Sequence, residues 1–192
     1  MNSLLSPQRL WSRAEVLAKP CPVPRSAGVY AWYFREIPPE VPTVECRTFD
    51  GLTLLYAGIS PKAPPQNGRL PSTQTLCDRI RYHYRGNAYG STLRLTLGCL
   101  LPGMQLRRVG STGERLHFAD DEQTLSDWMG RNAFVTWLAC DEPWKVEEEM
   151  IRSVSLPLNL DQNRSHHFHA VLSLRRKEAR LRAKELPIVA GY

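Results

Sequence analysis

Residues 28–34 read GVYAWYF, and residues 52–59 read LTLLYAGI. Both stretches are dense in aromatic and aliphatic residues, which favours strands, and the second contains a glycine that allows a sharp backbone turn. We therefore predict strands over about residues 28–35 and 52–59. The tyrosines of GVY and YAG, Tyr30 and Tyr56, are therefore placed on two rigid elements.

Helix-like and strand-like stretches alternate along the rest of the chain. In residues 73–85, apolar residues recur every four positions, which predicts a helix with one buried stripe, and Ser72 or Thr73 can cap its start. The stripe comprises Leu76, Ile80 and Tyr84. Further helices are predicted over residues 6–18, 91–101, 122–129, 143–156 and 166–186, and strands over 115–118 and 133–140. This alternation indicates a small single-domain α/β sandwich with a central sheet flanked by helices.

Two of these predictions rest on local details. Ser6 and Pro7 suit the cap and the first turn of the helix over residues 6–18. In residues 91–101 the leucines recur both at helical spacing, with Ser91 as the cap, and at every second position. A strand therefore remains an alternative there.

Length and composition limit the class of protein. The 192 residues are 42% hydrophobic and 23% charged, which is typical of one globular domain with a proper core. No apolar stretch approaches the length of a membrane span, and the first residues lack the layout of a signal peptide, so we expect a cytoplasmic protein. The five cysteines are scattered without a C-x-x-C pair, which predicts reduced thiols rather than disulfides or a zinc site.

The net charge of +6 is unevenly distributed. Residues 69–108 hold seven arginines and one aspartate, and residues 164–185 hold seven basic and two acidic residues. Between them, residues 114–161 hold eleven acidic and four basic residues. This segregation favours a surface that binds a polyanion such as nucleic acid. The alternative is that the basic and acidic segments pair with each other across the fold.

The order of several short motifs resembles that of a known family. GVY at residues 28–30 and YAG at 56–58 are followed by a Leu-x-x-Arg at 76–79, and then by Glu147 ahead of Asn159. This series is similar to the GIY-YIG nuclease superfamily, whose members cut DNA phosphodiesters with one divalent metal ion. The resemblance spans roughly residues 26–160 and implies a mainly antiparallel central sheet.

The resemblance also implies roles for individual residues. Arg79 would hold the scissile phosphate through its bidentate fork, and Glu147 would bind a single Mg²⁺ or Mn²⁺. Tyr56 would accept a proton from the attacking water or orient it, with nearby cations favouring its phenolate, and Tyr30 would position the nucleophile or support Tyr56. The implied catalytic set is Tyr30, Tyr56, Arg79, His83, Glu147 and Asn159, in which His83 assists proton transfer and Asn159 braces the site.

Some assignments stay open at this point. The stretch over residues 60–74 is longer than in many relatives and is either a substrate-contacting loop or a surface excursion. Because of it, Arg81 or Arg85 is an alternative to Arg79 as the phosphate ligand. Nucleic-acid contacts are predicted for Arg81, Arg85, Arg94, Arg175 and Arg176. The histidines of HHFH at 166–169 suggest a structural or phosphate-contacting role ahead of a metal site.

The predicted organisation is an N-terminal helical extension (1–25), a GIY-YIG-like nuclease domain (26–160) and a basic C-terminal helix (161–192). The predicted function is a metal-dependent DNA endonuclease with tyrosine-assisted attack by water, without a small-molecule cofactor and without a membrane. One alternative is a nucleic-acid-binding module of the same fold that cleaves little or not at all. Another is a regulatory or structural protein whose basic surface meets a protein partner. The oligomeric state is left open.

Overall fold

A computed structural model describes residues 1–65, 67–68 and 70–190. The helices are α1 (Asn2–Leu5), α2 (Arg13–Leu17), α3 (Leu76–Arg85), α4 (Thr92–Leu100), α5 (Asp121–Asn132), α6 (Pro143–Ser153) and α7 (His169–Glu185). The strands are β1 (Gly28–Phe34), β2 (Thr48–Phe49), β3 (Leu52–Ser60), β4 (Arg107–Val109), β5 (Arg115–His117) and β6 (Ala133–Ala139). No helix within these described residues is long and apolar enough to cross a membrane.

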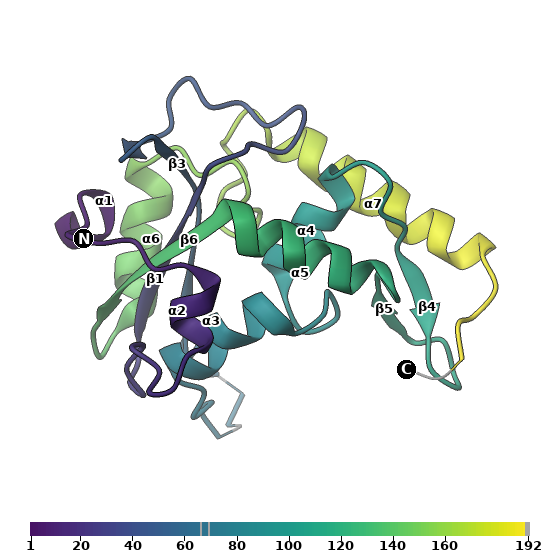
Figure 1. Ribbon diagram of the computed structural model, residues 1–192, viewed down its shortest axis with the longest axis horizontal. Helices are drawn as coiled ribbons and strands as arrows, with labels where there is room; N and C mark the ends of the chain where they lie inside the picture. Colours follow the sequence, from purple (N-terminus) through teal and green to yellow (C-terminus); the bar gives the residue numbers. More distant parts are fainter. Residues whose placement is uncertain (66, 69, 191–192) are drawn as a thin grey trace.

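A four-stranded antiparallel sheet in the order β2-β3-β1-β6 lies toward one end of the protein (Figure 1). Every residue of β1 is buried, because the strand has a partner on each side and helices on both faces. Such a strand reads as a continuous apolar run rather than as an alternating one. The predicted α/β fold with a mainly antiparallel sheet flanked by helices is therefore confirmed.

The two faces of β1 belong to two separate hydrophobic clusters. Tyr30 and Trp32 point to the face on which α3 packs, whereas Val29 and Tyr33 point to the face covered by α1 and α6. Tyr56 of β3 lies in the same cluster as Tyr30. The period of two along each strand therefore brings both phenols to one face of the sheet.

The helices α4, α5 and α7 extend the domain away from the sheet (Figure 1). Helix α7 packs on α4 and on β4 of the small β4-β5 hairpin, and Val189 forms a parallel bridge to Val109. The segment over residues 91–101 is a helix, as the capping Ser91 predicts, with buried Leu93, Leu97 and Leu100. The alternative of a strand at this place is thus excluded.

The prediction of one continuous helix over residues 6–18 is wrong. The chain forms the short α1 and α2 instead, and Ser12 rather than Ser6 caps α2 through a capping box with Glu15. Between them, the backbone N–H and C=O of Trp11 bond the backbone of Val135 at the free edge of β6. The segment uses its backbone groups on the sheet, so it cannot also use them in a helix.

The start of α3 also differs from its prediction. Thr75 caps the helix, because its hydroxyl accepts from the Asp78 N–H while the Asp78 carboxylate accepts from the Thr75 N–H. This reciprocal arrangement satisfies two backbone donors that the first helical turn leaves open. Neither Ser72 nor Thr73 is the cap. The short β2 and β4 strands and α1 were not predicted from the sequence.

Candidate active site

A cavity of about 670 Å³ opens where the ends of β1 and β3 meet α3 and α6. It is bordered by the two sheet tyrosines, one arginine, one glutamate and one asparagine that the sequence singles out. These residues are Tyr30, Tyr56, Arg79, Glu147 and Asn159. Four separate elements and the segment after α6 therefore bring the proposed chemical groups to one place.

Tyr30 crosses over Gly58, its antiparallel partner on β3. A Cβ atom built on Gly58 would lie 2.6 Å from the Tyr30 hydroxyl, so only glycine leaves room for the ring there. The hydroxyl lies 2.8 Å from Nε2 of His83, and the Arg79 guanidinium is nearby. Burial raises the pKa of Tyr30 to about 12, although Arg79 opposes this, so the phenol is neutral near pH 7.

Tyr56 is also a neutral phenol. Burial, followed by the nearby Tyr30 and by the Glu147 carboxylate, raises the pKa of Tyr56 well above 10, and the opposing charge of Arg79 is insufficient to reverse this. The expectation that nearby cations favour a phenolate is therefore not met by Arg79 alone. Of the two tyrosines, Tyr30 is the one whose hydroxyl is hydrogen-bonded to His83.

His83 is completely buried, with its ring against those of Tyr30 and Tyr56. The imidazole meets the ring of Tyr30 at 5.3 Å between centroids and the ring of Tyr56 at 6.4 Å, and its Nδ1 lies 2.7 Å from the Ser91 hydroxyl. Burial, with Arg79 and Arg94 as additional causes, lowers the pKa of His83 well below 6.5. The ring is therefore neutral, and each nitrogen has one partner.

Helix α3 separates its arginines between two cavities. Arg79 lines the cavity with the tyrosines, where its Nη1 donates to the Gly90 carbonyl at 2.8 Å. Arg81 and Arg85 instead line a cavity of about 420 Å³ beside Cys21. The geometry favours Arg79 over Arg81 and Arg85 as the ligand of a phosphate held near Tyr30.

Glu147 projects from α6 into the cavity. None of the hydrogen bonds or ion pairs between described residues involves its carboxylate. Burial raises the pKa of Glu147 to about 7, with Lys62 lowering it and Asp161 raising it further. A partly desolvated carboxylate that forms no ion pair gains from binding a cation.

The arrangement suits a hard cation held by few protein ligands. Within the described residues no cluster of three or more His, Cys, Asp or Glu side chains could hold a metal ion alone. Mg²⁺ commonly binds one or two carboxylates and completes its shell with water and phosphate oxygens. Glu147, with Asp161 lining the same cavity, fits that pattern.

Asn159 bonds the backbone of β3 next to Tyr56. Its Oδ1 accepts from the Ala57 N–H at 3.0 Å, and its Nδ2 donates to the Ala57 carbonyl at 2.8 Å. These two backbone groups face away from β1, beyond the end of the two-residue β2, so the amide takes the place of a missing strand. Both amide atoms are thereby engaged with the strand that carries Tyr56.

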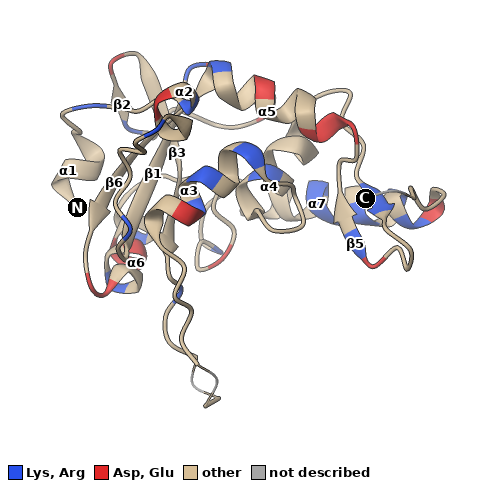
Figure 2. Ribbon diagram, turned by 60° about the horizontal axis from the view of Figure 1, so that its bottom comes forward, with Lys and Arg blue, Asp and Glu red and all other residues tan. Residues whose placement is uncertain are grey.

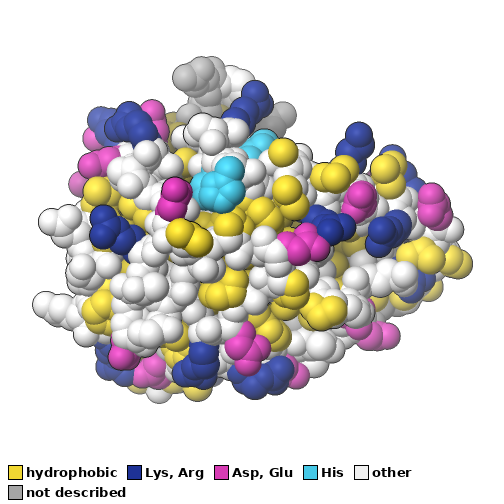
Figure 3. Space-filling view, turned by 90° about the horizontal axis from the view of Figure 1, so that it is seen from above, with side chains coloured by type: hydrophobic (Ala, Val, Ile, Leu, Met, Phe, Trp, Pro, Cys, Tyr) yellow, Lys and Arg dark blue, Asp and Glu magenta, His cyan; other side chains and the backbone are white. Residues whose placement is uncertain are grey.

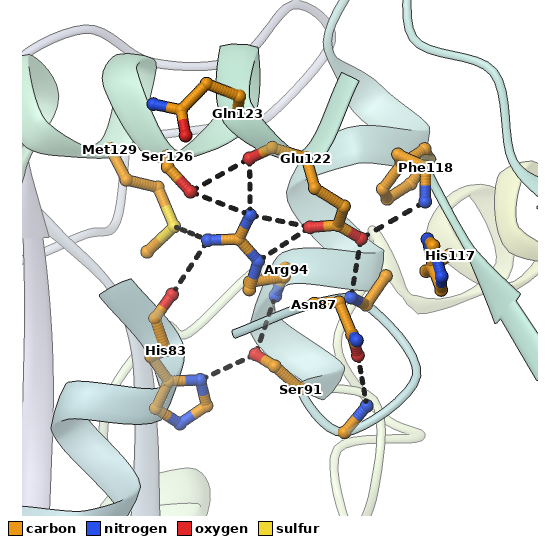
Figure 4. Close-up of polar contacts among 12 residues, drawn as sticks. His83, Asn87, Ser91, Arg94, His117, Phe118, Glu122, Gln123, Ser126 and Met129 are labelled. Atoms are coloured by element: carbon orange, nitrogen blue, oxygen red, sulfur yellow. Dashed lines mark hydrogen bonds and ion pairs between the residues drawn. The ribbon is translucent and has the colours of Figure 1, made fainter. Parts of the chain in front are cut away.

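Arg94 cannot contact nucleic acid, contrary to the prediction. Its side chain is completely buried, and it forms an ion pair of 2.6 Å with Glu122 on α5 (Figure 4). The guanidinium also donates to the backbone carbonyls of His83 and Glu122 and to the Ser126 hydroxyl. It therefore connects α3, α4 and α5 inside the protein. The burial of Arg94 could not be predicted from the sequence, because the leucine pattern of α4 does not indicate a buried cation.

The other predicted basic contacts lie on the outer helix α7. Arg175 pairs with Glu40 at 2.6 Å and with Glu178, and it is partly exposed. Arg176 is half-buried, and burial followed by the neighbouring Arg180 lowers its pKa. Figure 2 shows Lys and Arg on α3, α4 and α7 and acidic residues on α5. Part of the charge segregation is thus neutralised by pairing, as the alternative interpretation of the sequence states.

Figure 3 shows histidine side chains together on one face of the protein, and the HHFH motif contributes His166, His167 and His169. His166 and His167 stack at 4.6 Å between ring centroids. Nε2 of His166 lies 3.0 Å from the Ser155 hydroxyl, and its Nδ1 accepts from the Phe168 N–H. Both nitrogens of His166 are therefore occupied, which agrees with a structural role.

Several cavity residues were not identified from the sequence. Trp144, Lys62, Tyr89 and Asp161 all line the cavity. The sequence could have identified Trp144, because it stands three residues before Glu147 and therefore lies on the same face of the helix. Lys62 belongs to the long stretch over residues 60–74, whose two ends border the cavity, so this stretch contributes to the site.

Comparison with known proteins identifies the family. The family model described as the GIY-YIG catalytic domain matches residues 28–178, most of the chain. No curated protein and no solved structure gives a significant match. The family comprises nucleases, implies DNA as the substrate and generally uses divalent metal ions. The chain belongs to the GIY-YIG nuclease superfamily.

Proposed function

We propose that this protein is a divalent-metal-dependent endonuclease that hydrolyses DNA phosphodiester bonds at the cavity lined by Tyr30, Arg79 and Glu147. The observation that supports this most is their convergence from three different elements, β1, α3 and α6. Hydrolysis needs a positively charged group in contact with the phosphate, a group that orients the attacking water and an acceptor for the proton of that water. The cavity has a candidate for each need.

Arg79 would bind the scissile phosphate. Its Nη1 already donates to the Gly90 carbonyl, which orients the guanidinium toward the cavity. A guanidinium held in this way loses little side-chain entropy when it binds an oxyanion. Its charge would favour the pentavalent transition state over the bound phosphodiester, since negative charge builds up there.

The Tyr30 and His83 pair would take the proton of the attacking water. In the tautomer whose Nδ1 donates to Ser91, Nε2 of the neutral His83 accepts from the Tyr30 hydroxyl. As water attacks the phosphorus, its proton moves to the Tyr30 oxygen while the Tyr30 proton moves to Nε2. This route needs no free phenolate, which the raised pKa of both tyrosines disfavours. It places the proton on an imidazole whose pKa is lowered by burial, so the negative charge that develops on the phosphate must stabilise the imidazolium. Tyr56 would orient the water.

Glu147 would hold Mg²⁺ or Mn²⁺ within reach of the phosphate. When bound, such an ion supplies charge that polarises the phosphate and stabilises the departing 3′ oxygen. Asn159 would maintain the position of Tyr56 by fixing the backbone of β3. We also propose a cytoplasmic location, since all five cysteines are free thiols.

The test is cleavage of plasmid and of single-stranded DNA with Mg²⁺ or Mn²⁺. We expect Glu147→Gln and Arg79→Ala to abolish cleavage, since each removes a charge that acts on the phosphate. Matched controls are Glu148→Gln and Arg152→Ala, exposed residues of α6 outside the cavity. Cleavage that persists in both site variants would refute the assigned site. Salt-sensitive binding by the wild type without any cleavage would instead support the binding-module alternative.

A further inference from the structure

Tyr89 stands at the border between two cavities. It lines the cavity of Tyr30 and Arg79 and also a second one of about 580 Å³ that contains Arg85 and Arg115. Despite this position, 64% of its surface is exposed. A large aromatic side chain held open to solvent at the edge of a charged site suggests a binding surface for another flat ring.

The loop that carries Tyr89 is held in one conformation. Figure 4 shows Asn87 and Glu122 beside it: the Asn87 Oδ1 accepts from the Gly90 N–H at 3.3 Å, and the Glu122 carboxylate accepts from the Ala88 N–H at 2.7 Å. The Gly90 carbonyl accepts from Arg79. These contacts fix the backbone on both sides of Tyr89, so binding to its ring requires little ordering of the loop.

Close packing strengthens this arrangement. A Cβ atom on Gly90 would lie 2.3 Å from the hydroxyl of Tyr82, so the loop lies directly on that side chain. Tyr82 in turn donates to Asn87 at 3.1 Å. The backbone next to Tyr89 therefore contacts both α3 and the proposed phosphate ligand Arg79. Tyr89 and Arg79 line the same cavity, so the ring would be near a nucleotide whose phosphate Arg79 binds.

Inside a DNA duplex both faces of each base are covered by neighbouring bases. An exposed aromatic ring can therefore stack only on a base that is unpaired or at an end. We propose that Tyr89 stacks on an unpaired base next to the scissile phosphate, and that the preferred substrates are DNAs whose cleaved strand is single-stranded on one side of the cut. Arg85 and Arg115 in the second cavity would contact the phosphates of that single strand. This inference rests on the proposed function.

The experiment measures DNA affinity in the Glu147→Gln protein with a chelator, so that cleavage does not interfere. The ligands are a blunt duplex and the same duplex with a single-stranded dT tail at its 5′ or 3′ end. Tyr89→Ala and Tyr89→Leu remove the flat ring, whereas Tyr89→Phe keeps it. Val44→Ala, at an exposed residue that lines none of the described cavities, is the matched control.

We expect Tyr89→Ala and Tyr89→Leu to weaken binding of one tailed duplex by about tenfold, because loss of base stacking costs on that order. Tyr89→Phe should bind as the parent does. All variants should affect the blunt duplex, which exposes base faces only at its two ends, less than the tailed duplex. Equal losses on blunt and tailed DNA, or a Leu variant that matches Phe, would overturn the inference while leaving the proposed function intact. A parent protein that binds neither DNA would overturn both.

Discussion

The Tyr30 hydroxyl and Nε2 of His83 lie 2.8 Å apart in the protein interior, between β1 and α3. Neither side chain is more than 1% exposed, so the contact is made without competing water. It fixes the orientation of both rings and joins the phenol to a neutral imidazole. Removing either partner leaves the other with an unsatisfied polar atom.

We predict that His83→Phe lowers kcat by about 10²- to 10⁴-fold, because the acceptor for the proton is lost while the ring volume is kept. KM for DNA should change little, since His83 does not reach the phosphate. Tyr30→Phe should have a similar effect, and the double variant should be no worse than either single variant. Steady-state cleavage kinetics of the three proteins check this. Additive losses would contradict a shared proton route.

The raised pKa of Glu147 predicts a pH-dependent cost to stability in metal-free protein. Between about pH 4.5 and 7 the folded state binds more protons at this carboxyl than the unfolded state, so stability falls as pH rises. Glu147→Gln should therefore stabilise the protein at pH 8 by about 1 kcal/mol, or about 2–4 °C in Tm, since the cavity opening reduces the effect. The gain should vanish below pH 4.5.

Thermal unfolding with a chelator at several pH values measures this difference. Glu148→Gln is the matched control, because Glu148 neighbours Glu147 on α6 but is exposed. A stabilisation by Glu147→Gln that does not depend on pH would show that desolvation of the Glu147 carboxylate is not its cause.

Loss of the buried Arg94 cation should destabilise the fold. Arg94→Ala leaves the Glu122 carboxylate without its partner and removes the link between α3, α4 and α5, so we predict a loss of about 3–5 kcal/mol. Arg175→Ala, which breaks an exposed pair with Glu40, should cost less than about 1 kcal/mol. Urea unfolding compares the two variants. Equal effects would refute a structural role for the buried pair.

Gly58→Ala should disrupt the site through Tyr30. The added Cβ would meet the Tyr30 hydroxyl at 2.6 Å, and the ring cannot move aside without breaking its bond to His83. We predict a loss of stability of about 1–3 kcal/mol and a fall in kcat of about 100-fold. The control is Gly130→Ala, where the nearest neighbour is a flexible arginine side chain. Unfolding and cleavage assays on both variants test the prediction.

The main strands and helices could be predicted from the sequence where local pattern and tertiary environment agree. Residues 28–34 form a strand in the prediction and in the structure, and the four-residue spacing of Leu76 and Ile80 marks the buried stripe of α3. Prediction failed at residues 6–11, because Trp11 bonds the edge of β6 in preference to continuing a helix. Local propensity does not register an unpaired sheet edge supplied by residues more than a hundred positions away.

For the candidate site, the sequence by itself determined which residue types stand on which elements and in which order. Tyrosines on two strands, an arginine on α3 and a glutamate on α6 follow from local patterns and motif spacing. Only the tertiary structure decided that these groups share one cavity, that Arg79 rather than Arg81 reaches it, and that His83 and Arg94 are buried. The protonation of the tyrosines, His83 and Glu147 depends on that burial, because the desolvation of a charge is set by all surrounding atoms and not by neighbours along the chain.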